Sequence, residues 1–167
     1  MNHYLVISLF AILPLLTYSQ SETCKCCTEN HQAFDFWIGE WEVTNPDGTV
    51  AGKNSITKIQ DKCILQENWI GTSGNAGTSM NFYNLKTQQW EQLWIDNSGS
   101  HLKLKGNRIG DRMILSSEEF THTDGNEYVN RITWSFNVDG TVRQLWEVLK
   151  NEKVVNVAFD GLYTKLE

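Results

Sequence analysis

The chain has 167 residues, which is enough for one ordinary domain and too few for two domains with separate hydrophobic cores. Hydrophobic residues make up 40% of the sequence and charged residues 20%, a composition that excludes a disordered chain. The formal net charge of −6 argues against nucleic acids and anionic membranes as partners, because both bind basic surfaces.

The N-terminal segment has the pattern of a cleaved signal peptide. An apolar run over residues 5–16 is too short to span a bilayer and is followed by small residues before Gln20. We therefore predict a signal peptide over residues 1–19, export to the periplasm or the cell exterior, and no membrane span in the mature chain. Because the first four residues contain no Lys or Arg, an uncleaved anchor or a buried N-terminal helix stays open as an alternative.

The four cysteines are predicted to form disulfides. Cys24, Cys26 and Cys27 lie in an N-terminal arm over residues 20–33, and Cys63 lies farther along the chain. Thiols pair in an oxidising compartment, so we predict a bridge from Cys63 to one of the other three, which the sequence does not single out. The cluster could also bind Cu(I) or Zn, but no second ligand pair stands at metal spacing, so no metal is predicted.

Residues 34–167 are predicted to form a single all-β domain. Residues 28–37 favour a short helix that caps one end, and the runs after it alternate apolar and polar residues between turns rich in Gly, Asp and Asn. The predicted strands cover residues 40–45, 50–60, 63–70, 77–84, 89–96, 100–105, 112–119, 127–137, 141–149 and 153–165. Short connections favour an antiparallel meander, and about ten strands favour closure into a barrel, because closure removes the sheet edges.

Three of these strands place aromatic and polar side chains on one face. The shared faces carry Leu65, Glu67 and Trp69; Trp90, Gln92, Trp94 and Asp96; and Val142, Gln144, Trp146 and Val148, with Arg143, Leu145, Glu147 and Leu149 opposite the last set. A mixed face of this kind favours a ligand cavity inside the barrel, although each ring taken singly could simply fill a core.

A resemblance to a known family rests on five segments. They are FDFWIGEW at 34–41, LQENW at 65–69, WEQLWID at 90–96, RQLWE at 143–147 and FDGLY at 159–163. Gly39 and Trp41 resemble the Gly-x-Trp opening of calycin barrels such as lipocalins, and the five segments together resemble a family of exported bacterial proteins of unassigned function. The resemblance implies a lipocalin-like barrel and no particular activity. It also implies that an arginine from a late strand, Arg131 or Arg143, packs over Trp41.

Heme-binding barrels of related architecture use a histidine on a late strand as the proximal heme ligand. Here His31, His101 and His122 lie in the N-terminal segment, at a strand start and in a predicted hairpin loop. We therefore predict solvated histidines and no heme or other cofactor.

Binding of a small molecule is the function that the sequence favours. Rings of Trp69, Trp90, Trp94, Trp134 and Trp146 would surround an apolar or ring-bearing ligand, and Glu67, Gln92, Asp96 and Glu147 would orient its polar groups. The oligomeric state is not predicted.

Two other functions stay open. Glu67, Asp96 and Glu147 could carry acid–base catalysis with Arg131 or Arg143 as electrostatic partner, although we assign no catalytic residue and find no motif for nucleophilic, phosphoryl-transfer, zinc-protease or nicotinamide chemistry. An exposed row of tryptophans could instead bind carbohydrate or protein at the surface.

Overall fold

The computed structural model describes residues 24–166, so the predicted signal peptide lies outside the described residues. Two short helices precede the strands, α1 (Glu29–Gln32) and η1 (Asp35–Trp37). No helix in the described chain is long and apolar enough to cross a membrane.

The strands are β1 (Gly39–Thr44), β2 (Val50–Ile59), β3 (Ile64–Gly71), β4 (Ala76–Asn84), β5 (Gln89–Asp96), β6 (His101–Ile109), β7 (Arg112–Ser116), β8 (Phe120–Thr121), β9 (Glu127–Phe136), β10 (Val142–Lys150) and β11 (Lys153–Lys165).

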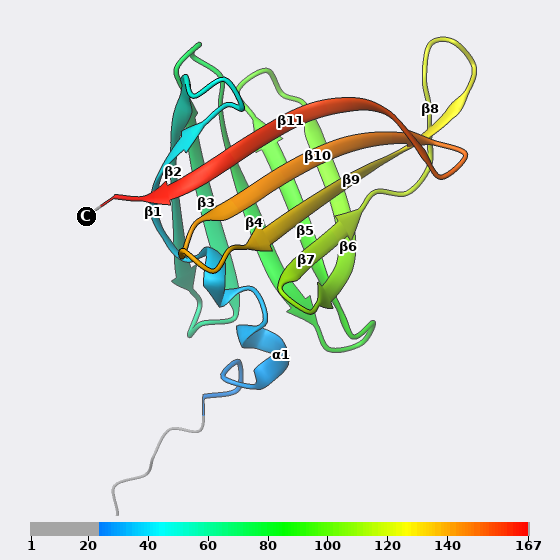
Figure 1. Cartoon of the computed structure of the whole chain (residues 1–167). Coiled ribbons are helices and arrows are strands. Elements are labelled where there is room, and N and C mark those ends of the chain that lie inside the picture. Colours follow the sequence, from blue (N-terminus) through cyan, green and yellow to red (C-terminus); the bar gives the residue numbers. More distant parts are fainter. Residues whose placement is uncertain (1–23, 167) are drawn as a thin grey trace, which may run out of the picture.

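Ten of these strands form a closed antiparallel barrel (Figure 1). Strands β1 to β7 pair in sequence order, β7 pairs with β9, and β9, β10 and β11 continue the meander until β11 pairs with β1. The short β8 pairs only with the start of β9, in a hairpin that projects from the barrel. The predicted all-β meander and its closure are confirmed. The sequence analysis missed β8 and ended β6 four residues early.

The hairpin turns follow from side chains that the sequence supplies. At the β1–β2 turn, Asp47 Oδ1 accepts a hydrogen bond from the Thr49 amide at 3.0 Å, and Gly48 has a φ of 83°. The β9–β10 turn repeats the arrangement, with Asp139 Oδ1 accepting from the Thr141 amide at 3.0 Å. Because Asp caps its own turn and Gly takes a positive φ without strain, these short connections hold neighbouring strands antiparallel.

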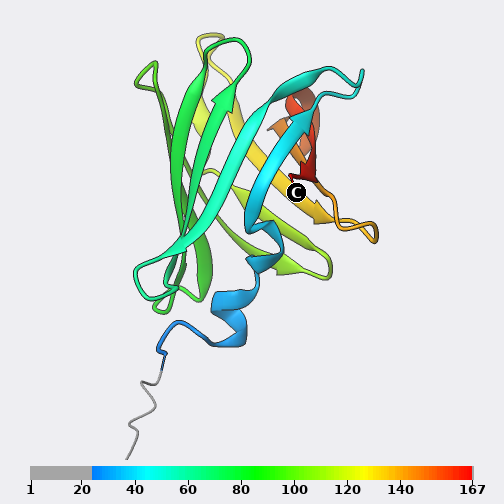
Figure 2. The same ribbon diagram turned by 90° about the vertical axis from the view of Figure 1, so that its left-hand side faces the viewer.

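The N-terminal arm, continued by Phe34 and η1, plugs one end of the barrel (Figures 1 and 2). Phe34 and Trp37 have no exposed surface, and their ring centroids lie 4.9 Å apart. Trp134 of β9 packs against both of them, with centroid distances of 5.2 and 5.3 Å. The predicted helical cap is therefore confirmed, as two short helices that together cover the barrel end.

One disulfide fixes this arm to the barrel, and a second lies within the arm. Cys26 is bonded to Cys63, which stands just before β3, and Cys24 is bonded to Cys27 within the arm. The predicted bridge from Cys63 to the cysteine cluster is confirmed, with Cys26 as the partner. All four thiols are used in these bonds, so the cluster has no thiolate left to bind a soft metal ion.

The first and last strands meet beside Trp41. The Lys165 ammonium lies 5.4 Å from the centre of the Trp41 ring, and a Cβ on Gly39, which has a φ of 147°, would stand 3.1 Å from the Lys165 side chain. Gly39 and Trp41 thus have structural roles at this seam.

The expectation that an arginine packs over Trp41 is wrong. Arg131 and Arg143 point to the outer face, where they bond Glu147 at 2.9 Å and Asp160 at 2.6 Å. Their strands place both side chains on the face opposite Trp146, so neither can enter the barrel. The ten strands also exceed the eight of a lipocalin. The barrel stands, but the specific likeness to lipocalins is weaker than the opening residues indicate.

Candidate functional site

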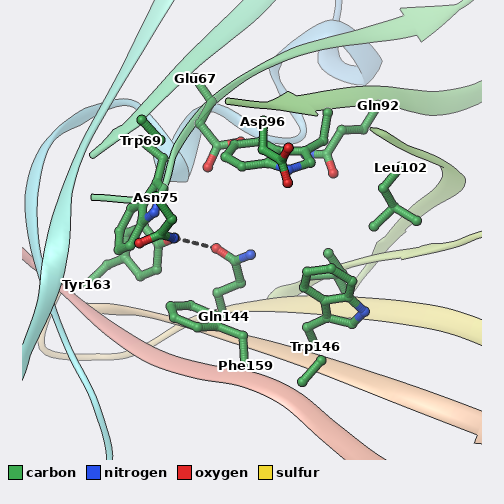
Figure 3. Close-up of a pocket in the computed structure, with 14 residues that line it drawn as sticks. Glu67, Trp69, Asn75, Gln92, Asp96, Leu102, Gln144, Trp146, Phe159 and Tyr163 are labelled. Atoms are coloured by element: carbon green, nitrogen blue, oxygen red, sulfur yellow. Dashed lines mark hydrogen bonds between the residues drawn. The ribbon is translucent and has the colours of Figure 1, made fainter. Parts of the chain in front are cut away.

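A cavity of about 270 Å³ lies inside the barrel, away from the end that the arm covers. Its aromatic walls come from Trp69, Trp94, Trp146, Phe159 and Tyr163, and its aliphatic walls from Leu102 and Ile132. Polar side chains of Glu67, Asn75, Gln92, Asp96 and Gln144 complete the lining (Figure 3). The volume is near the lower limit of ligand pockets, roughly 300 to 1,000 Å³, so the space suits a molecule of one or two rings.

Glycines on neighbouring strands keep two of the indole rings against the barrel wall. A Cβ on Gly77 of β4 would stand 2.3 Å from the Trp94 ring, and a Cβ on Gly52 of β2 would stand 2.7 Å from the Trp69 ring. No real side chain tolerates such distances, so any larger residue would push the rings inward. The cavity therefore exists partly because these positions lack side chains.

Glu67 lies at the inner part of the cavity and is held by neutral donors. Its two carboxylate oxygens accept hydrogen bonds from Asn54 Nδ2 at 2.7 Å and from Ser79 Oγ at 2.6 Å. Asn54 Nδ2 also donates to the Tyr163 hydroxyl at 3.3 Å, and that hydroxyl in turn donates to Gln144 Oε1. A continuous polar network thus joins β2, β3, β4, β10 and β11 across the barrel.

A second branch of the network fixes Gln92. Its Nε2 donates to Asn81 Oδ1 at 2.7 Å, and Asn81 Nδ2 donates to Ser79 Oγ at 2.8 Å. Because each amide is oriented by its neighbours, the polar groups that face the cavity are held in place before any ligand arrives.

Burial changes the acidity of this network. Glu67 is only 5% exposed, and burial raises the pKa of its carboxyl group from 4.5 to about 6, against the lowering effect of the Ser79 and Asn54 hydrogen bonds. Burial, and then the nearby Glu67 charge, raises the pKa of the Tyr163 hydroxyl well above its usual value. Tyr163 is therefore a neutral donor at physiological pH.

Asp96 lies at the end of β5, level with Trp69 through Gly77 of β4, in a different environment. Its Oδ1 accepts hydrogen bonds from Ser98 Oγ at 2.6 Å and from the amides of Ser98 and Ser100. The Ser98 hydroxyl, as the largest cause, lowers the pKa of this carboxyl group. Asp96 is thus ionised and is engaged in capping the β5–β6 turn.

Six of the residues predicted to bind a ligand line this cavity, and three do not. The six are Glu67, Trp69, Gln92, Trp94, Asp96 and Trp146. Trp90 packs at the plugged end, where its Nε1 donates to the Asn30 carbonyl at 3.1 Å, and Trp134 packs there against Trp37. Glu147 lies on the outer face with Arg131. Alternation predicts which side chains share a face of a strand, but not how far along the barrel axis each of them lies. Trp90 and Trp134 lie nearer the plugged end than the cavity does.

Sequence reasoning missed several lining residues, one of which it could have found. Gln144 shares a strand face with Trp146, so alternation groups it with a residue already assigned to the site. Phe159 and Tyr163 share a face of β11, which alternation groups with each other but not with the site. Asn54 and Ser79 were missed for another reason. Isolated Asn and Ser residues in strands carry no sequence signal of burial, and only the barrel brings them to Glu67.

The histidines are distributed differently from the prediction. His101 and His122 are exposed, as expected, but His31 is buried, with Nδ1 2.7 Å from the Thr28 hydroxyl and its ring against Tyr83. Helix α1 directs the His31 side chain toward Tyr83 of β4. No histidine lines the cavity of the described chain.

Neither a protein-family model nor a curated protein matches this chain. The resemblance to a family of exported bacterial proteins therefore stays a prediction.

Proposed function

We propose that this protein is an exported binding protein that holds a small apolar or ring-bearing molecule inside its barrel. The observation that carries the proposal is the cavity of about 270 Å³, walled by five aromatic side chains and fixed polar groups. A barrel core that served stability alone would be packed to crystal-like density, without such a space.

The export half of the proposal rests on the cysteines. Both disulfides of the described chain need an oxidising compartment to persist, which agrees with the signal peptide predicted from the sequence. N-terminal sequencing of the protein recovered outside the cytoplasm should start after Ser19. A start at Met1 would contradict cleavage.

The alternative functions have less support. The raised pKa of Glu67 would suit acid–base catalysis, but its carboxylate bonds only Asn54 and Ser79 in the described chain, and Asp96 is engaged by its own turn. Glu147 is outside the barrel. Surface recognition by a row of tryptophans would need exposed rings, and all seven tryptophans are buried or half-buried.

A ligand titration tests the proposal. Naphthalene, phenethyl alcohol and decanol should each be added to the purified protein while Trp fluorescence and the melting temperature are recorded. Because Trp69, Trp94 and Trp146 line the cavity, an occupant should shift or quench part of the emission and raise the melting temperature.

Filling the cavity provides the matched variant. Leu102→Trp adds a large ring to the cavity wall and should weaken binding at least about tenfold by calorimetry, because the lost volume excludes the ligand. The control is Ile95→Trp, a half-exposed position on the outer face of β5, which should bind as the wild type does. Equal binding by both variants would overturn the proposal, as would silence toward these three compounds and toward phenethylamine and hydrocinnamate.

A further inference from the structure

The charge inside the cavity has one sign. Glu67 and Asp96 line it, and no Lys, Arg or His is among its lining residues in the described chain. The arginines of the late strands lie outside, paired with Glu147 and Asp160. The interior therefore repels carboxylates and phosphates and attracts cations.

Glu67 lacks the partner that buried carboxylates usually have. Buried charges in proteins are normally paired with an opposite charge, because burial of an unpaired ion is costly. Glu67 is held only by the neutral Asn54 and Ser79 side chains. The structure thus keeps an anionic group at the inner part of a cavity without supplying its counter-charge.

Hydrogen-bond acceptors are also in excess around this point. Gln92, which lines the cavity, uses its Nε2 in the bond to Asn81, and its Oε1 accepts no hydrogen bond from the described chain. Oxygens of Glu67, Gln92 and Asp96 point toward the same space in Figure 3. A ligand that brings N–H donors would satisfy groups that a purely apolar ligand would leave unpaired.

The aromatic walls of the cavity suit a cation as well. Trp69, Trp146 and Phe159 present rings to the space, and the face of an aromatic ring attracts ammonium groups. Aromatic rings together with a carboxylate are the usual means by which proteins hold organic cations.

We propose that the ligand of this cavity is a protonated amine on an apolar or ring-bearing body, with its nitrogen at Glu67 and its body among Trp69, Trp94 and Trp146. This inference rests on the proposed function, because it names the ligand class of the same cavity. It excludes fatty acids and other organic anions as ligands.

Three probes that share one body and differ in charge test the ligand class. Phenethylamine is cationic, phenethyl alcohol neutral and hydrocinnamate anionic. Calorimetry on the wild-type protein at pH 7.5 should give an affinity for the amine at least about tenfold above that for the alcohol, since a charge-assisted hydrogen bond is stronger than a neutral one. Hydrocinnamate should not bind measurably.

Two variants locate the effect at Glu67. Glu67→Gln keeps the shape of the side chain and its bond to Asn54. It should make the affinities for amine and alcohol about equal, while the alcohol still binds. The control is Glu147→Gln, which removes a carboxylate from the outer face of the barrel and should leave the preference unchanged.

The pH dependence of the wild-type protein gives a second measurement, which needs no variant. Amine affinity should fall as the pH drops through about 6, where Glu67 takes up a proton, while alcohol affinity stays level. The other titratable groups of the cavity do not interfere, because the pKa of Asp96 is lowered and that of Tyr163 is raised. Alkyl amines stay protonated throughout this range.

The outcomes separate the two proposals. Equal affinity for amine and alcohol, or tighter binding of hydrocinnamate, would overturn the ligand class and leave the binding function standing. An unchanged preference in Glu67→Gln would remove Glu67 from the proposal. If none of the three probes binds, and neither naphthalene nor decanol binds, both the ligand class and the binding function are overturned.

Discussion

At the end that the N-terminal arm covers, aromatic rings pack against one another, whereas in the open half similar rings surround a space. Phe34, Trp37 and Trp134 have at most 1% of their surface exposed and touch ring to ring. Trp69 and Trp94 lie against Gly52 and Gly77 and leave a cavity between them.

Under the proposed function, the two ends of the barrel separate stability from ligand binding. Dense ring packing at the plugged end contributes dispersion energy and buries apolar area. The open half gives up some of that packing and places a buried carboxylate, which is unfavourable for folding, where a ligand could reach it. Changes at the plugged end should therefore affect unfolding, and changes in the open half should affect ligands first.

The largest expected effect is at the plugged end. Trp37→Ala should lower the free energy of unfolding by about 3 to 5 kcal/mol, because it leaves a hole among Phe34, Trp134 and Tyr163. Denaturant unfolding followed by circular dichroism measures it.

A matched change separates the ring from its N–H group. Trp37 Nε1 has no hydrogen-bond partner in the described chain, so Trp37→Phe removes an unpaired donor and should cost clearly less than Trp37→Ala. Equal losses in the two variants would mean that ring packing does not stabilise this end.

The next largest effect concerns the bridge that holds the arm. Cys26 and Cys63 are 37 residues apart in sequence, and replacing both with Ser should cost about 2 to 4 kcal/mol by releasing a constraint on the unfolded chain. Thermal unfolding of the double variant measures the loss. Loss of the Cys24–Cys27 bridge, which closes a much shorter loop, is the control and should cost less. The reverse order would contradict the structural role assigned to the long-range bridge.

A smaller effect of opposite sign is expected in the open half. The pKa of Glu67 is about 6 in the folded protein and 4.5 without burial, so the folded state holds an extra proton between these values. The extra proton on Glu67 therefore stabilises the folded state fully at low pH, and this stabilisation is lost as the pH rises from 4.5 to 6. Glu67→Gln should remove this dependence and stabilise the protein by about 2 kcal/mol at pH 7.

Melting temperatures of both proteins between pH 4 and pH 8 provide the measurement for Glu67. If this residue makes wild-type stability rise between pH 4.5 and 6, or if Glu67→Gln is less stable than the wild type at neutral pH, the ionised carboxylate stabilises the fold and the prediction is wrong.

The sequence predicted the barrel well because strands and turns are local patterns. Alternation and the Asp-Gly turns located ten strands, and alternation also grouped Glu67 with Trp69 and Gln92 with Trp94. It could not tell the inner face from the outer one or the plugged end from the open half, since both depend on how ten strands tilt and close. That is why Trp90 and Trp134 were assigned to a site that they do not line. Glu147 was assigned against the alternation itself, which places it on the face opposite Trp146.

The seam between β1 and β11 has a consequence for biogenesis. Trp41 is paired with Lys165, so the first strand finds its final neighbour only in the last residues of the chain. Such distant partners make folding slow, and the barrel cannot close until the last strand is available to pair with the first. Until then β1 offers a free edge to which another chain could add a strand.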